Sequence, residues 1–295
     1  MQTLIQTLVA GVLLGGVYAL VSVGLNLMFG VVRIINFAHG ELVMAGMYLT
    51  FWLWALWGVD PYVSLLIVTP VMFLVGLVLQ RVVIQPIQGS SAVMKIFMTV
   101  GVSIVLQNLA LYLWDGEHRS VNSATSGAVL QVAEIAISVP RLIAFGGALL
   151  LVAALFHLMN RTLTGKVLRS IAEDRSTAVL MGVPVKRFYL AATGLTAVLA
   201  GVAGSLLTPF TSVFPLFGVH MTLIAFIVVV IGGMGNMVGA VVGGILLGGV
   251  ETLAGTYIAP ALQQVVLFVL FIVVVLLRPQ GLFGAGAGSE EVGLK

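Results

Sequence analysis

Two apolar runs, LIAFGGALLLVAALFHLM (142–159) and FYLAATGLTAVLAGVAGSLL (188–207), flank the stretch RTLTGKVLRSIAEDRSTAVLMGVPVKR (161–187). Each run is nearly free of charge and about as long as the hydrocarbon core of a bilayer is thick. The stretch between them carries six of the 13 lysines and arginines of the chain. A basic segment between two such runs must lie on one side of a membrane, and we call residues 161–187 the basic loop.

The composition of the whole chain agrees with a membrane protein. Of its 295 residues, 60 % are hydrophobic and 8 % are charged, whereas a soluble domain carries about 25 % charged residues. The apolar runs do not alternate with polar residues, so a transmembrane barrel is excluded. We predict an all-α polytopic membrane protein with about eight transmembrane helices. Residues 4–30 are compatible with one tilted helix or with a helix plus a broken half.

The apolar pattern gives one domain and an orientation. Residues 1–284 form a single transmembrane domain, and the glycine-rich tail 285–295 is expected to be disordered. Basic residues of membrane proteins concentrate in cytoplasmic loops. Segments expected in the cytoplasm are the basic loop, Arg81, Lys95 and Arg278, with the C-terminus, while 115–127 and 208–218 are expected outside.

Within the basic loop, no proline or further glycine occurs between Gly165 and Met181, and apolar residues recur at helical spacing. Gly182 and Pro184 are typical of a helix end. This pattern predicts an amphipathic helix over 165–181, which needs a partner groove or a lipid surface. Its mixed charges favour a protein groove, although charge alone also fits an ordinary cytoplasmic loop.

Two interruptions of the apolar pattern are candidates for a translocation path or a hinge. RIINFAHGE (33–41) forms a polar turn, and GGMGN (232–236) separates two apolar arms. The surrounding segments 29–46 and 231–248 share this plan, which leaves an internal repeat open. Polar residues inside the membrane, Gln107 and Asn108 among them, are expected to face the bundle interior. The candidate path or hinge residues are Asn26, Asn36, His39, Glu41, Gly232, Gly233, Gly235, Asn236 and Glu251.

No pattern indicates an enzyme. The four histidines lie far apart, and Gly165-Lys166 is not followed by the serine or threonine of a phosphate loop. We therefore expect no catalytic residue, no metal, no cofactor and no nucleic-acid partner. The absence of a series of acids and bases suited to proton relay favours energy supplied from elsewhere.

Four blocks carry a family resemblance: GLNLMFGVVRIINFAHGELVMAGMY (24–48), TGKVLRSIAEDRSTAVLMGV (164–183), VVIGGMGNMVGAVVGG (229–244) and RPQGLFG (278–284). In this order they resemble the permease subunits of bacterial branched-chain amino-acid ABC transporters. The similarity is closer to the H-type subunit of the leucine/isoleucine/valine system than to the M-type. Urea and short-amide permeases of the same family are similar, so the substrate stays open at this point.

The resemblance implies an ABC importer permease fold in the bacterial inner membrane. Implied partners are two ATP-binding subunits, a second related permease subunit, a periplasmic binding protein and membrane lipid. The basic loop would be the coupling loop, whose helix 165–181 moves as a rigid lever. Its candidate residues are Arg169, Ala172, Glu173, Asp174, Ala178 and Gly182. Since Asp174 and Arg175 follow Glu173, the acidic-Ala-Ala pattern of the family is only partly kept. A self-contained channel or facilitator and a sodium-driven carrier are the competing hypotheses.

Overall fold

A computed structural model describes residues 1–123, 125–132 and 135–284, so the expected disorder of 285–295 lies outside the described residues. The first half contains α1 (Gln2–Val32), α2 (His39–Trp57), α3 (Leu65–Leu79), the π-helix η1 (Gln80–Ile84), α4 (Gln85–Ile87), α5 (Ala92–Trp114), β1 (Val129–Val132) and β2 (Ile135–Ser138). The second half contains α6 (Val139–Arg161), α7 (Leu163–Glu173), α8 (Arg175–Leu180), α9 (Val185–Leu207), α10 (Phe217–Gly232), α11 (Met237–Tyr257), the 3-10 helix η2 (Pro260–Leu262) and α12 (Gln263–Leu277).

The predicted fold class is confirmed. Seven helices of the described chain are long and apolar enough to cross a membrane, and α10 is a shorter apolar helix. The predicted count of about eight agrees with this. Residues 4–30 fall within the single 31-residue helix α1, so of the two possibilities for this run, the unbroken helix is the one observed.

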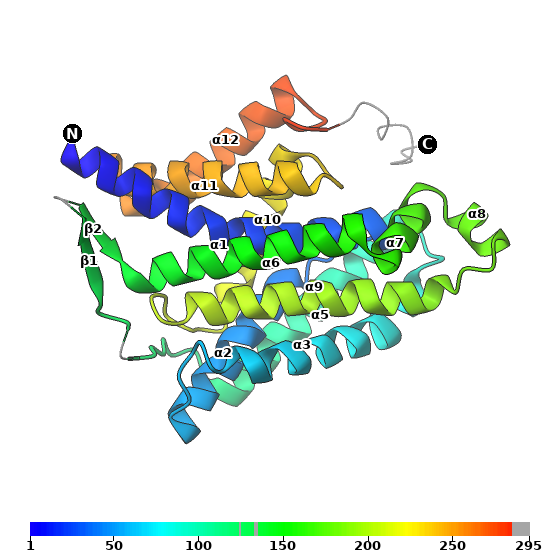
Figure 1. The fold of residues 1–295 in the computed structure, drawn as a ribbon, viewed down its shortest axis with the longest axis horizontal. Coiled ribbons are helices and arrows are strands. Elements are labelled where there is room, and N and C mark those ends of the chain that lie inside the picture. Colours follow the sequence, from blue (N-terminus) through cyan, green and yellow to red (C-terminus); the bar gives the residue numbers. More distant parts are fainter. Residues whose placement is uncertain (124, 133–134, 285–295) are drawn as a thin grey trace.

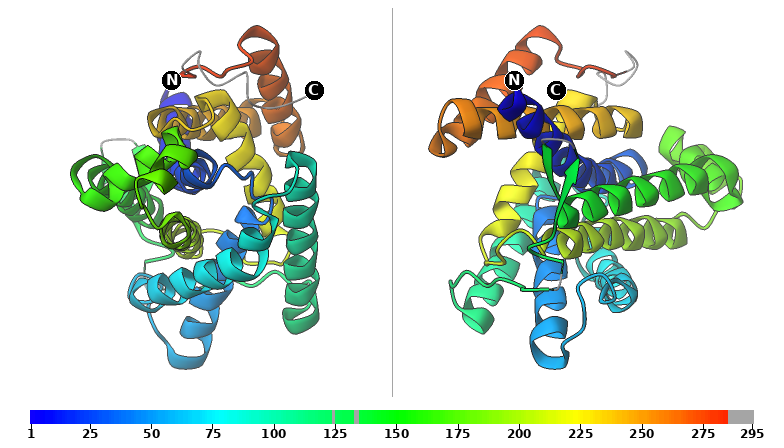
Figure 2. Two further views of the ribbon diagram at one scale, coloured as in Figure 1. Left: turned by 90° about the vertical axis from the view of Figure 1, so that its right-hand side faces the viewer. Right: turned by 60° about the vertical axis from the view of Figure 1, so that its left-hand side comes forward.

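The helices differ greatly in how much of their surface the chain itself covers. Helices α1, α6, α9 and α11 run along one another, whereas α2 and α5 cross this axis steeply (Figures 1 and 2). Within the most apolar 18-residue stretch of each helix, 83 % of the residues are buried in α9 and 11 % in α5. The corresponding figure is 6 % for the stretch formed by η2 and α12. The interior therefore lies around α1 and α9, and α5 and α12 present apolar surface outward.

A seam of glycines joins the first long helix to α11. A β-carbon at Gly248 would lie 2.5 Å from the Gly11 carbonyl oxygen and 2.5 Å from the Cα of Gly15. A β-carbon at Gly15 would in turn lie 2.6 Å from the Cα of Ile245. The two backbones thus approach as closely as small residues at a spacing of four, such as Gly11 and Gly15, allow.

Helix α3 does not end at the polar pair Gln80-Arg81. It begins at Leu65 and continues through the π-turn η1 into α4. Gln80 is 1 % exposed, and its amide oxygen accepts a hydrogen bond of 2.6 Å from the Thr193 hydroxyl of α9. The pair is therefore an internal contact followed by an exposed arginine.

A short antiparallel pair of strands, β1 and β2, follows α5. Leu130 of β1 pairs with Ile137 of β2. The strand pair leads directly into α6 (Figure 1). It satisfies backbone groups of a segment that carries too little apolar periodicity for a helix.

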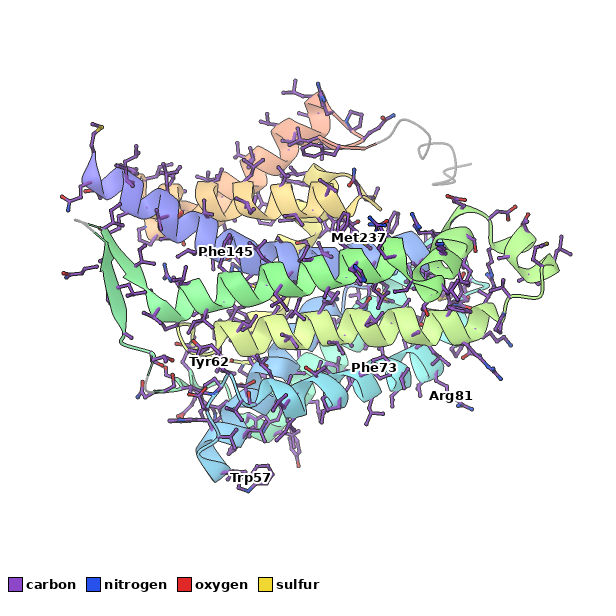
Figure 3. The ribbon with its side chains drawn as sticks, in the orientation of Figure 1. Trp57, Tyr62, Phe73, Arg81, Phe145 and Met237 are labelled. Atoms are coloured by element: carbon purple, nitrogen blue, oxygen red, sulfur yellow. The ribbon has the colours of Figure 1, made fainter. Side chains whose placement is uncertain are left out.

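The loops expected on opposite faces of the membrane gather at separate places. Arg119 and Val213, from the two stretches expected outside, form a β-bridge with N···O distances of 2.9 and 2.7 Å. At the other end of the bundle, Arg81 lines a cavity together with residues of the basic loop, and Figure 3 shows it at the end that carries α7 and α8. The grouping of segments agrees with the charge count.

Gly248→Ala tests the glycine seam. The added methyl group would overlap the backbone of α1, which cannot yield without a shift of the whole helix, so we expect a loss of about 1–3 kcal/mol in stability. The measurement is the thermal unfolding midpoint of the purified chain in detergent, followed by tryptophan fluorescence.

Gly249→Ala is the matched control for this variant. A β-carbon at Gly249 meets no atom within 4 Å, and alanine is the better helix former. The midpoint of this variant should equal or exceed that of the parent. An equal fall for both variants would contradict the seam.

Candidate functional site

After α1 the chain re-enters the bundle. Arg33 ends α1 in the left-handed conformation (φ 56°, ψ 42°), and α2 does not start until His39. Between them, Ile34 and Asn36 are each 1 % exposed. The polar turn predicted over 33–41 is therefore a buried connection apart from Arg33, and we call residues 34–38 the re-entrant segment.

His39 places the start of α2 beside a point about two thirds of the way along α1. Its Nε2 lies 2.8 Å from the carbonyl oxygen of Val21. Val21 precedes Arg33 by 12 residues (33 − 21), which is roughly 18 Å at 1.5 Å per helical residue. Gly24 leaves room for the imidazole, because a β-carbon there would lie 3.2 Å from His39 Cε1.

Glu41 sits in the first turn of α2 and is fully buried. Its Oε1 accepts a hydrogen bond of 3.0 Å from the Ser103 hydroxyl of α5. Gly218 of α10 makes space for the carboxylate, since a β-carbon there would overlap Oε2. A carboxylate in the first turn also interacts favourably with the positive end of the helix dipole.

Thr222 of α10 satisfies backbone groups at this break. The Gly40 N–H donates to the Thr222 hydroxyl oxygen at 3.0 Å. The same hydroxyl lies 3.0 Å from the Gly218 carbonyl oxygen and 3.2 Å from that of Phe37. A helix that starts inside a bundle needs such partners, because its first N–H groups have none of their own.

Three neighbouring side chains at this place each keep an unused polar atom. In the described part of the chain, Asn36 Nδ2, His39 Nδ1 and Glu41 Oε2 are buried without a hydrogen-bond partner. Buried polar atoms are rarely left in this state. Their concentration over six residues marks the start of α2 as a place where a polar ligand or water would make contact.

The second break, residues 233–236, is held by the side chain of Asn26. Gly233 and Gly235 both have positive φ, 99° and 84°. The Asn26 amide donates to the Asn236 carbonyl oxygen at 2.8 Å, and its oxygen accepts from the Gly235 N–H at 2.7 Å. A single side chain from α1 therefore replaces the partners that a helix would have supplied to this turn.

The RPQGLFG block packs against the same turn. The Leu282 N–H donates to the Ile231 carbonyl oxygen at 2.7 Å, and the Asn236 amide donates to the Phe283 carbonyl oxygen at 2.8 Å. Asn236 Oδ1 also caps α11 by accepting from the Gly239 N–H at 3.1 Å. The turn thus joins α1, α11 and the segment after α12.

The basic loop does not form the continuous helix predicted over 165–181. Helix α7 ends at Glu173 and α8 starts at Arg175, because Asp174 has an extended backbone (φ −143°, ψ 104°). The Asp174 carboxylate accepts hydrogen bonds from the hydroxyl and N–H groups of Ser176 and Thr177. These bonds, those of the Ser176 and Thr177 hydroxyls first, hold the pKa of Asp174 well below its ordinary value. Asp174 is therefore an N-cap and interrupts the expected lever.

The two helices of the loop present different surfaces. Leu168 and Ile171 of α7 are buried against the bundle. On α8, Val179 and Leu180 are 54 % and 86 % exposed, and Met181 after it is 79 % exposed. Gly182 then ends the segment with φ 79°, as its position in the sequence predicted.

Arg33 connects the basic loop to the re-entrant segment. Its guanidinium donates to the carbonyl oxygens of Ala172 at 2.9 Å and Glu173 at 3.3 Å, the last residues of α7. A cation at a helix C-terminus is favourable for the unpaired carbonyl groups there. Movement of α7 would therefore act directly on the point where α1 ends.

A cavity of about 180 Å³ brings the two predicted groups of residues together. Asn26 and Gly235 from the second break line it, as do Arg169 and Ala172 from α7. Glu251 lies elsewhere, on α11, where its carboxylate accepts a hydrogen bond from Tyr18. The nine path or hinge candidates therefore divide into the start of α2, the second break and the separate Glu251.

Sequence reasoning missed several residues of this arrangement. Ser103, Gly218 and Thr222 contact the start of α2 from other helices, and no local pattern singles them out. Arg33 was assigned only to a polar turn. Asn108 is exposed and bonds to the Ile104 carbonyl oxygen of its own helix at 2.8 Å, so its expected position in the bundle interior is wrong.

Comparison with known proteins adds an independent observation. The family described as the permease component of branched-chain amino acid transport systems matches residues 7–275. The chain belongs to this permease family. No solved structure matches the permease.

Individual relatives cover the permease almost from end to end. It is 30 % identical to the high-affinity branched-chain amino acid transport permease BraD of Pseudomonas aeruginosa and to LivH of Escherichia coli K12, over 95 % of both chains in each case. A probable LivH of Methanocaldococcus jannaschii is 29 % identical over 90 % of the permease and 88 % of that relative. The resemblance to the H-type subunit is confirmed, as is the expectation of a transport component instead of an enzyme.

Asn26→Leu tests whether this side chain holds the second break of the permease. The substitution keeps the branched shape but removes both hydrogen bonds, each worth about 0.5–1.5 kcal/mol, from the backbone groups of Gly235 and Asn236. We expect amide hydrogen exchange over 231–239 to accelerate by about tenfold or more. Asn108→Leu is the control, and it should leave exchange in this turn unchanged. Unaltered protection in the Asn26 variant would refute the assignment.

Proposed function

We propose that the permease forms the translocation path of an ATP-driven ABC importer for branched-chain amino acids. A periplasmic binding protein delivers the substrate, two ATP-binding subunits supply the energy, and a second related permease subunit completes the membrane domain. The observation that carries this proposal is the nearly full-length match to permeases of high-affinity branched-chain amino acid systems.

The start of α2 supplies polar groups suited to an amino acid. A zwitterion needs an acceptor for its ammonium group and a donor for its carboxylate. Glu41 Oε2 and Asn36 Nδ2 offer these two functions, and in the described chain both are buried without another partner. We assign contact with the passing substrate to this place, and the side-chain specificity to the binding protein.

The basic loop has the surface expected of a docking element for an ATP-binding subunit. Val179, Leu180 and Met181 form an exposed apolar tip, and the exposed charges of Arg169 and Glu173 lie on the preceding helix. An apolar anchor with charged neighbours fits a protein groove. The docking assignment also covers Ala172 of α7, Asp174 between the two helices, Ala178 of α8 and Gly182 after it.

Helix α5 supports a second permease subunit. Only 11 % of the residues in the most apolar 18-residue stretch of α5 are buried within this chain. Asn108 is exposed on the surface of this helix. A polar amide that faces lipid is unfavourable, whereas a neighbouring helix can hydrogen-bond it. We assign this surface to contact with the related subunit.

The bacterial relatives support a location in the inner membrane, and the charge distribution supports an orientation with the basic loop and the C-terminus in the cytoplasm. In that orientation, closure of the ATP-binding subunits moves α7. Arg33 passes the movement to the end of α1 and the re-entrant segment, while Asn26 links it to the turn at 233–236. The loop acts as two short helices about Asp174, and α7 alone is the rigid part.

ATP-dependent uptake tests the proposed function. The permease is expressed with the subunits encoded beside it and reconstituted into liposomes, and uptake of radiolabelled leucine is measured with its binding protein outside and ATP inside. We expect uptake that requires all components. Leucine uptake by the permease alone, down its gradient, would indicate a facilitator, and uptake driven by sodium would indicate a carrier. Uptake of urea without leucine would refute the substrate.

Arg33→Met tests the proposed coupling contact. Loss of these hydrogen bonds, worth about 1 kcal/mol at an exposed site, should loosen the link between α7 and α1 and lower the amount of leucine transported per ATP hydrolysed. Lys166→Met removes the same charge from an exposed position on α7 and should transport normally. Equal ratios of transport to hydrolysis in the parent and both variants would refute the role of Arg33.

A further inference from the structure

A second cavity, of about 670 Å³, lies at the end of the bundle that carries the basic loop. Four basic side chains line it, contributed by Arg81, Arg175, Lys186 and Arg187. They come from three separate elements, namely η1, α8 and the start of α9. The proposed transport function uses none of these four side chains.

The lining of this cavity is positively charged. None of its lining residues is an aspartate or glutamate. Asp174, the neighbour of Arg175 in sequence, is engaged with Ser176 and Thr177. Arg175 itself lies over the Tyr189 ring, with its Cζ 5.8 Å from the ring centroid. Four cations around one space repel one another unless an anion occupies it.

A phosphate group in this cavity would provide oxygen acceptors for the guanidinium groups that line it, which bind phosphate with favourable geometry. Gln88 lines the same cavity, and its side-chain Nε2 has no hydrogen-bond partner among the described residues.

The surroundings identify the source of the anion. Leu74, Val78 and Val82, spaced four residues apart on α3 and η1, are 60 %, 61 % and 67 % exposed. They form an apolar stripe that leads along the helix surface to Arg81, shown at the end of the bundle in Figure 3. Leu190 adds an apolar wall to the cavity. A headgroup among the cations with an acyl chain on this stripe matches both parts of the surface.

We propose that this cavity binds the phosphate headgroup of an anionic phospholipid, which thereby fastens α8 to η1 and α9. A basic pocket between transmembrane helices at the membrane surface suits such a headgroup. The apolar tip at 179–181 stays free for the ATP-binding subunit. The inference depends on the position of these side chains and not on the transported substrate.

The test is a titration of the full chain in neutral detergent with phosphatidylglycerol and, separately, with phosphatidylcholine, with bound lipid counted by native mass spectrometry. We expect clear preference for phosphatidylglycerol, and binding about tenfold or more weaker in the double variant Arg81→Gln/Arg187→Gln, which removes two of the four charges. Both side chains are exposed, so the variant should fold, as gel filtration will verify.

Arg161→Gln is the matched control, because Arg161 is exposed at the end of α6 and does not line the cavity. It should bind phosphatidylglycerol like the parent. Equal binding of the two lipids, or equal losses in the double variant and the control, would overturn the proposal. Inorganic phosphate that binds without lipid and depends on the same arginines would overturn the lipid as its source. The double variant is also co-expressed with the ATP-binding subunit and purified. If it binds lipid like the parent but no longer co-purifies with that subunit, the two arginines contact the subunit and not a lipid.

Discussion

The structure depends on one constraint, that backbone N–H and C=O groups inside a membrane need partners within the protein. Continuous helices meet it without help, and most of the chain is of this kind. The two breaks in the apolar pattern do not. At the first, Thr222 receives the Gly40 N–H, and at the second, Asn26 pairs with both Gly235 and Asn236. Each break is thus made possible by one polar side chain from a distant helix.

The same two side chains bear on the proposed role of the breaks in transport. A break fixed by a few hydrogen bonds can change its conformation at lower cost than a helix with a full ladder. Both breaks lie next to the basic loop or are linked to it. Arg33 holds the end of α7 and precedes the first break, and a small cavity separates α7 from the second. A signal from the loop has a short physical route to either one.

The sequence was sufficient for what composition and local spacing determine. The number of apolar runs, the Gly11 and Gly15 contact and the end of the loop at Gly182 follow from the residues themselves. The interruption at Asp174 could have been predicted, since the serine and threonine after it make the aspartate a strong helix cap, but the helical spacing was given more weight. The depth of His39, the space at Gly218 and the cap by Thr222 arise from contacts between remote segments, and no local pattern contains them.

The separation of these contacts along the chain has a consequence for biosynthesis. Gly40 is made 182 residues before Thr222 (222 − 40), which at 5–20 residues per second is a delay of about 10 to 40 s. During this interval the re-entrant segment has neither its cap nor α10 beside it, and the glycine face of α1 still awaits α11. Until α10 is made, the backbone groups of the first break therefore need another hydrogen-bond partner. Water in the insertion machinery can supply it.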